Sequence, residues 1–208
     1  MKKAISLIAL TAAAGLLNCS CCGDKTVKQV SEMEKSEIIM DNILTRTSIR
    51  AFKEMPVEQE KLEKLVRAGM AAPSAVNSQP WAFVVVTERG QLENLRAAHP
   101  HAQMLGTAQA AIVVCGDMRK SLEGWAQDYW IQDASAATEN ILLAAHGLGL
   151  GAVWTGVYPN PEIMPQVSEA LDLPSYIIPL NVIPIGYPDQ FPDPKDKWKE
   201  DNVHYNRW

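Results

Sequence analysis

Apolar residues that recur every three or four positions predict the helices of this chain. Between residues 58 and 71, Leu62, Leu65 and Met70 fall on one face, which is the spacing of an amphipathic helix. A longer segment, 124–148, combines a small Ala-rich face with an apolar stripe, and it predicts a long packed helix. Similar spacing predicts shorter helices at 37–44, 88–98 and 161–171.

Short runs of β-branched and apolar residues predict strands between these helices. Residues 82–87 and 110–115 are almost wholly apolar, as in strands that are buried in a core. A later apolar run, 177–185, contains Pro179 and Pro184. Because proline cannot donate to a sheet ladder, we expect this run at a sheet edge, or its prolines at strand ends.

Glycines at 147, 149 and 151 separate the long predicted helix from a short predicted strand at 152–154. A dinucleotide-binding fingerprint also has closely spaced glycines, but it follows a strand and opens a helix. Here the helix comes first. We therefore interpret the glycines as a helix C-terminus and a tight turn.

A polar segment, 72–81, stands between a predicted helix and a predicted strand and reads Ala-Pro-Ser-Ala-Val-Asn-Ser-Gln-Pro-Trp. Few of its polar groups could be satisfied in a core, so we expect a loop. Rigid elements on both sides would hold this loop at the entrance of a strand, where binding groups are commonly placed.

A second polar motif, Arg46 to Phe52, alternates basic and hydroxyl side chains with Ile49 and Phe52. It offers two guanidinium groups and two hydroxyls within five residues. Such groups suit a phosphate, which accepts charge-assisted and often bidentate hydrogen bonds from arginine. The alternative is an exposed helix end in which the two arginines are ordinary surface charges.

The first residues have the pattern of an export signal. Two lysines precede an apolar stretch, 4–17, that is too short to span a bilayer comfortably, so we assign residues 1–18 to a signal peptide. Residues 16–19, Leu-Leu-Asn-Cys, are similar to a bacterial lipoprotein signal in which Cys19 is acylated, with Cys21 or a soluble secreted form as alternatives. We expect a membrane-anchored lipoprotein on the periplasmic or outer-membrane face, with a polar tether at 19–36 and one domain at 37–208.

Length and composition fit one globular domain and limit the partners. The 208 residues are 47% hydrophobic and 21% charged, and the net charge of -5 argues against a nucleic-acid partner. Cys115 is the only cysteine after the N-terminal cluster, and it lies in a predicted buried strand, so we expect neither a disulfide framework nor a catalytic thiol. We expect no metal site, because the clustered cysteines lack partners at ligand spacing and His99 and His101 lie in a predicted exposed turn.

Three separated motifs, 46–52, 73–81 and 195–197, together resemble the FMN-dependent nitroreductase family. The resemblance extends over about 38–208. It implies an α+β fold, namely a nitroreductase-like three-layer α/β/α sandwich with a mixed, mainly antiparallel sheet. It also implies an intertwined homodimer with two FMN sites at the subunit interface.

The resemblance implies a role for each motif in binding FMN. One chain would hold the phosphate and ribityl groups, and its partner would supply the loop that walls the ring. The residues of the first set are Arg46, Ser48, Arg50, Lys195 and Lys197, with the backbone of Thr47 at the flavin ring. Those of the second set are Pro73, Ser74, Ala75, Asn77 and Gln79. The backbone of Thr155 and Gly156 would lie near the flavin N5, and Trp130 is a substrate-pocket candidate.

This sequence departs from the family pattern at two of these positions. Ala75 stands where the family often has a hydroxyl side chain, which removes one hydrogen-bonding group. Asp196 stands between the two lysines, so the sequence leaves open which lysine reaches the phosphate.

The activity that the resemblance implies is hydride transfer from NADH or NADPH, through FMN, to a small electron-poor acceptor such as a nitroaromatic or a quinone. The chemistry would belong to the cofactor, and main-chain N–H groups would stabilise the reduced flavin, so we expect no catalytic side chain. Two alternatives stay open. One is a specialised flavin enzyme that carries out reductive dehalogenation or flavin fragmentation, and the other is a non-catalytic flavin-binding lipoprotein.

Overall fold

The computed structural model describes residues 23–208, so the signal peptide and Cys19 lie outside the described residues. The chain divides into two compact units after Ile39, and the globular unit is Met40–Trp208. Helix α1 (Gly23–Thr45) begins well before the predicted start at residue 37. The helix therefore includes most of the segment predicted as a polar tether. That segment lacks proline and is rich in the good helix formers Lys, Glu, Gln and Met, which favours a helix. No helix within residues 23–208 is both long and apolar enough to cross a membrane.

The globular unit is built on an antiparallel sheet. Its strands lie in the order β1-β2-β5-β3, and β4 also pairs with β5. Each pairing in the described residues is antiparallel, so the prediction of an α+β fold is confirmed, while the mixed component is absent from residues 23–208 of one chain. The strands are β1 (Trp81–Val86), β2 (Ala110–Asp117), β3 (Gly151–Ala152), β4 (Thr155–Gly156) and β5 (Ile177–Gly186).

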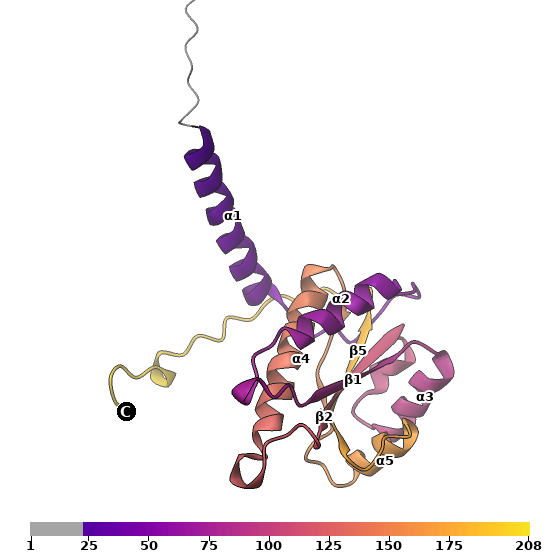
Figure 1. Ribbon diagram of the computed structural model, residues 1–208. Coiled ribbons are helices and arrows are strands. Elements are labelled where there is room, and N and C mark those ends of the chain that lie inside the picture. Colours follow the sequence, from indigo (N-terminus) through magenta and orange to yellow (C-terminus); the bar gives the residue numbers. More distant parts are fainter. Residues whose placement is uncertain (1–22) are drawn as a thin grey trace, which may run out of the picture. The chain divides into compact units, whose positions relative to one another are not determined.

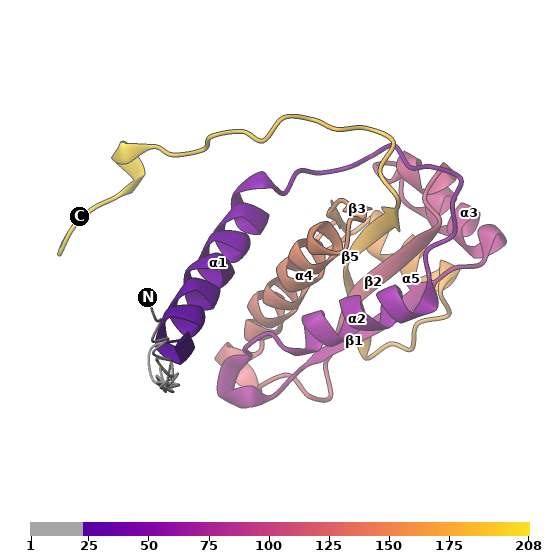
Figure 2. The same cartoon turned by 90° about the horizontal axis from the view of Figure 1, so that it is seen from above.

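Helices cover both faces of this sheet and give three layers (Figures 1 and 2). Alternation along β2 divides the core, because Ile112 and Val114 pack with α2 and α4, whereas Val113 and Cys115 pack with α3 and α5. Burial also raises the pKa of the Cys115 thiol to about 12, so it stays protonated at neutral pH. The helices are α2 (Gln59–Met70), α3 (Arg89–Ala98), α4 (Tyr129–Gly147) and α5 (Ile163–Ala170), with short 3-10 turns at Ala75–Asn77, Gln103–Gly106, Gly124–Ala126 and Glu200–Asn202.

The strand that contains two prolines is central, which corrects the prediction of a sheet edge. The ladder of β5 is interrupted near both prolines. Pro179 lies beside a register shift in the pairing with β2. Near Pro184, β3 pairs with residues 185–186 and β4 with residues 181–182, so neither short strand reaches residue 184. A central strand can hold proline where its ladder is already broken.

The predicted turn after the long helix is a Schellman motif. Gly149 has a φ of 73°. Its N–H donates to the carbonyl of His146, and the N–H of Leu150 donates to the carbonyl of Ala145. The helix precedes the glycines and β3 follows them, as the sequence predicted.

The turn after α3 differs from its prediction, because His99 is fully buried rather than exposed. Neither of its ring nitrogens has a hydrogen-bond partner within residues 23–208. Desolvation lowers the pKa of the imidazole, so His99 is neutral at physiological pH. The adjacent Pro100 and His101 are exposed.

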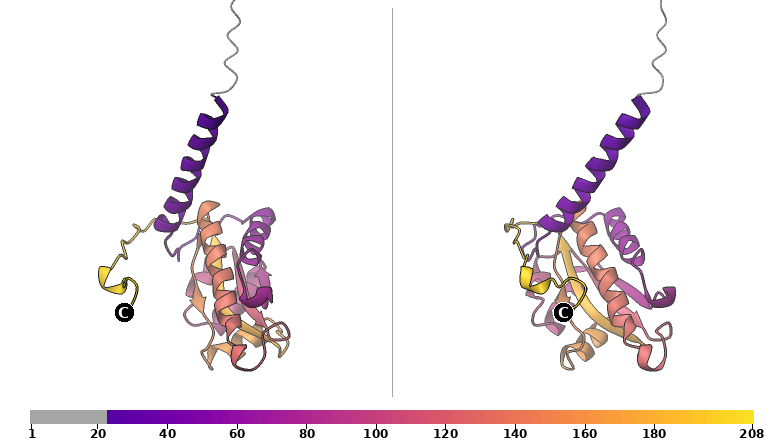
Figure 3. Two further views of the ribbon diagram at one scale, coloured as in Figure 1. Left: turned by 60° about the vertical axis from the view of Figure 1, so that its left-hand side comes forward. Right: turned by 90° about the vertical axis from the view of Figure 1, so that its left-hand side faces the viewer.

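The segment after β5 is extended and exposed. Figures 2 and 3 show it leaving the end of β5 and running away from the sheet. Its aromatic side chains Phe191, Trp198, Tyr205 and Trp208 are each at least 69% exposed. An extended segment that exposes several large aromatic side chains is typical of a surface that meets a partner.

Candidate functional site

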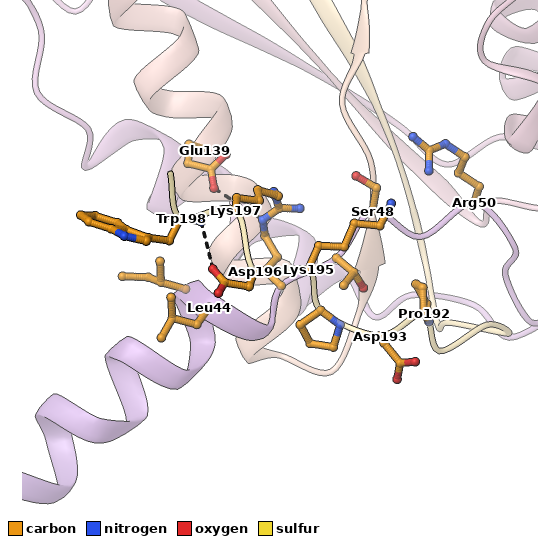
Figure 4. Close-up of a pocket in the computed structure, with 14 residues that line it drawn as sticks. Leu44, Ser48, Arg50, Glu139, Pro192, Asp193, Lys195, Asp196, Lys197 and Trp198 are labelled. Carbon is orange, nitrogen blue, oxygen red and sulfur yellow. Dashed lines mark hydrogen bonds and ion pairs between the residues drawn. The ribbon is translucent and has the colours of Figure 1, made fainter. Parts of the chain in front are cut away.

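A pocket of about 980 Å³ lies between the segment that follows α1 and the extended C-terminal tail. Figure 4 shows Ser48 and Arg50 on one wall, Lys195 and Lys197 on another, and Glu139 reaching in from α4. The volume is at the upper end of the range for small-molecule sites. The lining residues are Ile43, Leu44, Arg46, Thr47, Ser48, Arg50, Glu139, Pro192, Asp193, Pro194, Lys195, Asp196, Lys197 and Trp198.

Two buried apolar side chains hold the 46–52 motif against the core. Ile49 and Phe52 are buried, and the N–H of Ile49 donates to the carbonyl of Ala152 at 3.0 Å. With Ile49 directed into the core, its neighbours Ser48 and Arg50 line the pocket. Gly151 allows this close approach, because a Cβ there would lie 2.5 Å from Cγ2 of Ile49.

The pocket collects both signs of charge. Arg46, Arg50, Lys195 and Lys197 supply four cations. Glu139 lies 3.5 Å from Nε of Arg46, whose side chain is only 18% exposed. The hydroxyl groups and the cations together suit a phosphate monoester, and the Glu139 carboxylate is the group that would compete with it for Arg46.

Asp196, the acidic residue between the two tail lysines, accepts a hydrogen bond from a nearby backbone N–H. Its carboxylate accepts the N–H of Trp198 at 2.9 Å, as Figure 4 shows. Within the described residues no ion pair involves Lys195 or Lys197. Both lysines line the pocket, so the structure brings the first predicted set together in one chain.

The predicted loop of 73–79 has a strained backbone. Val76, Asn77 and Gln79 have φ values of 45°, 58° and 50°. Left-handed backbone is rare for non-glycine residues, and for a β-branched residue it marks a genuine outlier. Two hydrogen bonds that involve side chains support it within the loop, from the N–H of Gln79 to Oγ of Ser74 and from Nε2 of Gln79 to Oδ1 of Asn77.

The loop does not belong to the same pocket. The lining residues, all of which are described, include neither Pro73, Ser74, Ala75, Asn77 and Gln79 nor Thr155 and Gly156. Thr155 is held in β4, where its hydroxyl donates to the carbonyl of Val182 at 2.7 Å, while Gly156 is exposed. Within one chain, the predicted site residues therefore form separate groups.

Trp130, the predicted substrate-pocket residue, is buried in the core of the described chain. It is 3% exposed and stacks edge-on against Tyr158 at 5.0 Å between ring centroids. Gly116 makes room for it, since a Cβ there would lie 2.4 Å from the indole. The exposed aromatic residues of this region are Trp125 and Tyr129.

Sequence reasoning missed two carboxylates on α4, Glu139 at the pocket and Asp133 at the loop. The side chain of Asp133 is buried, and its Oδ1 accepts the N–H of Ala75 at 2.9 Å. The available signal was a lone acidic residue beside the Ala-rich face of a predicted core helix. Among the side chains of residues 34–208, no group of three or more His, Cys, Asp or Glu is arranged to hold a metal ion.

Comparison with known proteins places this fold and these motifs in one family. The family model described as "Nitroreductase family" matches residues 43–102 and 88–187. The two matches together span most of the globular unit, including the 46–52 segment, the 73–79 loop and β4. The chain belongs to the nitroreductase family.

Three relatives illustrate the range of similarity. A protein of Methanothermobacter thermautotrophicus named "Putative NADH dehydrogenase/NAD(P)H nitroreductase" is 42% identical over 86% of this chain and 91% of its own. A crystal structure under the same name from Parabacteroides distasonis is 49% identical, has a TM-score of 0.77 and covers 82% of this chain and 98% of its own. An FMN-dependent nitroreductase from Clostridium difficile is 33% identical with a TM-score of 0.75, over 81% and 99% of the two chains.

Proposed function

We propose that this chain is an FMN-dependent oxidoreductase that uses NADH or NADPH. The observation that carries the proposal is the pocket itself, in which the motif after α1 and the distant tail bring four cations and two hydroxyl groups together. Family membership supports it, as do the names of the relatives, one of which is called FMN-dependent.

Each part of the chain has a separate task in this proposal. Arg46, Arg50 and the tail lysines hold the phosphate of FMN, and Ser48 holds phosphate or ribityl oxygens. The backbone of Thr47, which lines the same pocket, would contact the flavin ring. When bound, FMN supplies the hydride-accepting and hydride-donating chemistry. The backbone N–H groups at β4 stabilise negative charge on the ring, so the chain needs no side-chain nucleophile or general acid.

We propose that the working form is a homodimer. Two observations support it. The loop of 73–79 lies outside the pocket that holds the cations, as expected if the loop completes the site of a partner chain. Large apolar side chains are also exposed on the globular unit, including Met40, Ile43 and Leu44 on α1 and the aromatic residues of the tail.

The acceptor in this proposal is a small, electron-poor molecule such as a nitroaromatic or a quinone. A hydride donor and its acceptor would take turns on the open face of the flavin. The acceptor would take a hydride from the reduced flavin and a proton from solvent, so neither step would require an acid or base from the chain. This suits a pocket that is lined by phosphate-binding groups rather than by a paired nucleophile and base.

We further propose that the chain is exported and anchored by a lipid at Cys19. The support is the order of basic, apolar and cysteine-containing segments at the N-terminus. In a bacterial host, Cys19→Ala should move the protein from the membrane fraction to the soluble exported fraction and abolish incorporation of labelled palmitate. Palmitate labelling that persists in Cys19→Ala and is lost in Cys21→Ala would assign the anchor to Cys21 instead.

The flavin proposal is tested with the purified full-length chain. After incubation with FMN and removal of the unbound fraction, we expect a yellow protein with flavin absorbance and one FMN per chain. Anaerobic addition of NADH or NADPH should bleach that absorbance, and a quinone should restore it. A protein that retains no FMN would refute the proposal, and one whose flavin stays oxidised with both nucleotides would restrict it to flavin binding.

A further inference from the structure

The strained loop of 73–79 needs an external support. Backbone in the left-handed region at Val76, Asn77 and Gln79 costs free energy at each residue, and it persists only where the surrounding structure imposes it. The two side-chain hydrogen bonds within the loop join loop residues to each other. They define its shape but do not fix it to the rest of the fold.

Asp133 supplies a connection between the loop and the body of the protein. Its Oδ1 accepts the N–H of Ala75 at 2.9 Å, one residue before Val76 and at the first residue of the 3-10 turn. Asp133 itself is fixed on α4, which packs against α2, β1 and the sheet centre. A carboxylate acceptor makes a stronger bond than a neutral one, because the bond is charge-assisted.

The surroundings of Asp133 argue against a purely stabilising role. The residue is 6% exposed, and its Oδ2 is buried with no partner within residues 23–208. Its neighbours on α4 include the buried residues Ala134 and Ala137. A buried carboxylate oxygen without a partner costs free energy, so an uncharged side chain here would suit the stability of the helix better.

We propose that Asp133 is a positioning residue, whose carboxylate fixes the loop of 73–79 in the conformation that receives the flavin. The inference rests on the proposed function, since it takes the loop as one wall of the flavin site. It also assigns the N–H of Ala75 to Asp133. The loop therefore meets the flavin through other groups, such as the side chains of Ser74 and Asn77.

The anchoring is measured without flavin, by amide hydrogen exchange of the FMN-free full-length chain. In the wild type, the N–H of Ala75 should be protected. Asp133→Ala removes the acceptor and should increase its exchange rate by at least tenfold, whereas Asp133→Asn retains a side-chain oxygen and should preserve the protection. Equal exchange at Ala75 in the wild type and Asp133→Ala would overturn the anchoring.

The flavin role is measured by titration of FMN fluorescence. We expect Asp133→Ala to weaken FMN binding about tenfold or more, which corresponds to about 1.4 kcal/mol, and Asp133→Asn to bind within about threefold of the wild type. The order of the two variants in stability should be the reverse of their order in affinity, because Asn buries an unpaired side-chain N–H, whereas Ala leaves only the part-buried N–H of Ala75 to be hydrated. If Asp133 had only a structural role, the two variants would follow the same order in stability and in FMN affinity.

Asn140→Ala is the matched control. Asn140 lies on the same helix and donates from its side chain to a backbone carbonyl, that of Ala68, at 3.0 Å. Its loss should lower the unfolding temperature and leave both Ala75 exchange and FMN affinity unchanged. A wild type that binds no FMN overturns the proposed function and this flavin role with it, while a wild type and an Asp133→Ala variant that bind FMN equally overturn the positioning role alone.

Discussion

Two regions of the molecule suit ligand binding in different ways. One is the pocket lined by 46–50 and 192–198, and the other is the loop of 73–79. The pocket is rich in charge and has walls from segments far apart in the sequence. The loop carries no charge, is held in a rare backbone conformation and is tied to α4. The pocket should therefore bind by electrostatics that salt and charge substitutions alter, and the loop by a shape that its supports maintain.

Removal of a pocket cation is the largest expected effect on binding. Arg46→Ala should weaken FMN binding by about 10- to 100-fold, because a hydrogen bond to a charged group contributes about 1.5–3 kcal/mol. Asn77→Ala in the loop removes a neutral group and should cost about 0.5–1.5 kcal/mol. Fluorescence titration measures both. Arg67→Ala is the control, since Arg67 is exposed on α2 and pairs with Glu63. Equal losses for Arg46→Ala and Arg67→Ala would contradict the phosphate assignment.

A change of shape in the pocket should have the next largest effect, without any change of charge. A Cβ at Gly151 would lie 2.5 and 2.7 Å from two carbons of Ile49, the buried residue between Ser48 and Arg50. Gly151→Ala should destabilise the fold by about 1–3 kcal/mol through overpacking. It should also weaken FMN binding as the segment shifts.

Thermal unfolding and FMN titration measure these two effects. Gly90→Ala is the control, because a Cβ at Gly90 meets nothing within 4 Å, and the change favours helix α3. If Gly151→Ala keeps the stability and affinity of the wild type, Ile49 does not hold the cationic segment in register.

The sequence predicted the elements better than the contacts between them. Periodicity located the major helices because one face of each is buried, and continuous apolar runs located the buried strands. The polar motif of 46–52 gave two of the four pocket cations. The sequence analysis placed the proline-containing strand at a sheet edge, because it could not show that the ladder beside a central strand is interrupted. It also missed Asp133 and Glu139, whose roles depend on which residues α4 faces, and it treated His99 as exposed although the turn folds back into the core.

Removal of the Glu139 carboxylate, which would compete with phosphate for Arg46, should strengthen FMN binding modestly. Glu139 pairs with Arg46 and is about half exposed, so Glu139→Gln should tighten FMN binding only a few-fold, about 0.2–1 kcal/mol. The gain should shrink as ionic strength rises, because screening weakens both the pair and the phosphate contact. Glu93→Gln on α3, which removes a comparable surface partner of Arg89 and Arg96, should leave affinity unchanged. Weaker binding by Glu139→Gln would show that Glu139 orients Arg46 rather than competing for it.

Acid should produce the smallest expected effect, a loss of fold stability at Asp117, where the segment after the loop joins the sheet. The N–H of Asp117 donates to the carbonyl of Pro80, and its buried carboxylate accepts hydrogen bonds from Arg119 at 2.9 and 2.7 Å. The hydrogen bonds from Arg119 lower the pKa of Asp117 below its usual 3.8. A carboxyl with a lowered folded pKa stabilises the fold above its unfolded pKa, and that contribution disappears as pH falls through the folded value.

Thermal unfolding between pH 7 and pH 2.5 tests this link. The wild type should lose more stability than Asp117→Asn as the pH falls below 3.8, because the variant has no carboxyl to protonate at this position. Asp172→Asn replaces an aspartate that forms no ion pair among the described residues, and its acid loss should match that of the wild type. An acid-dependent loss of stability that is absent in Asp117→Asn would assign that loss to the Asp117 carboxylate. An identical pH dependence of unfolding in the wild type and Asp117→Asn would show that the Asp117 carboxylate does not stabilise the fold.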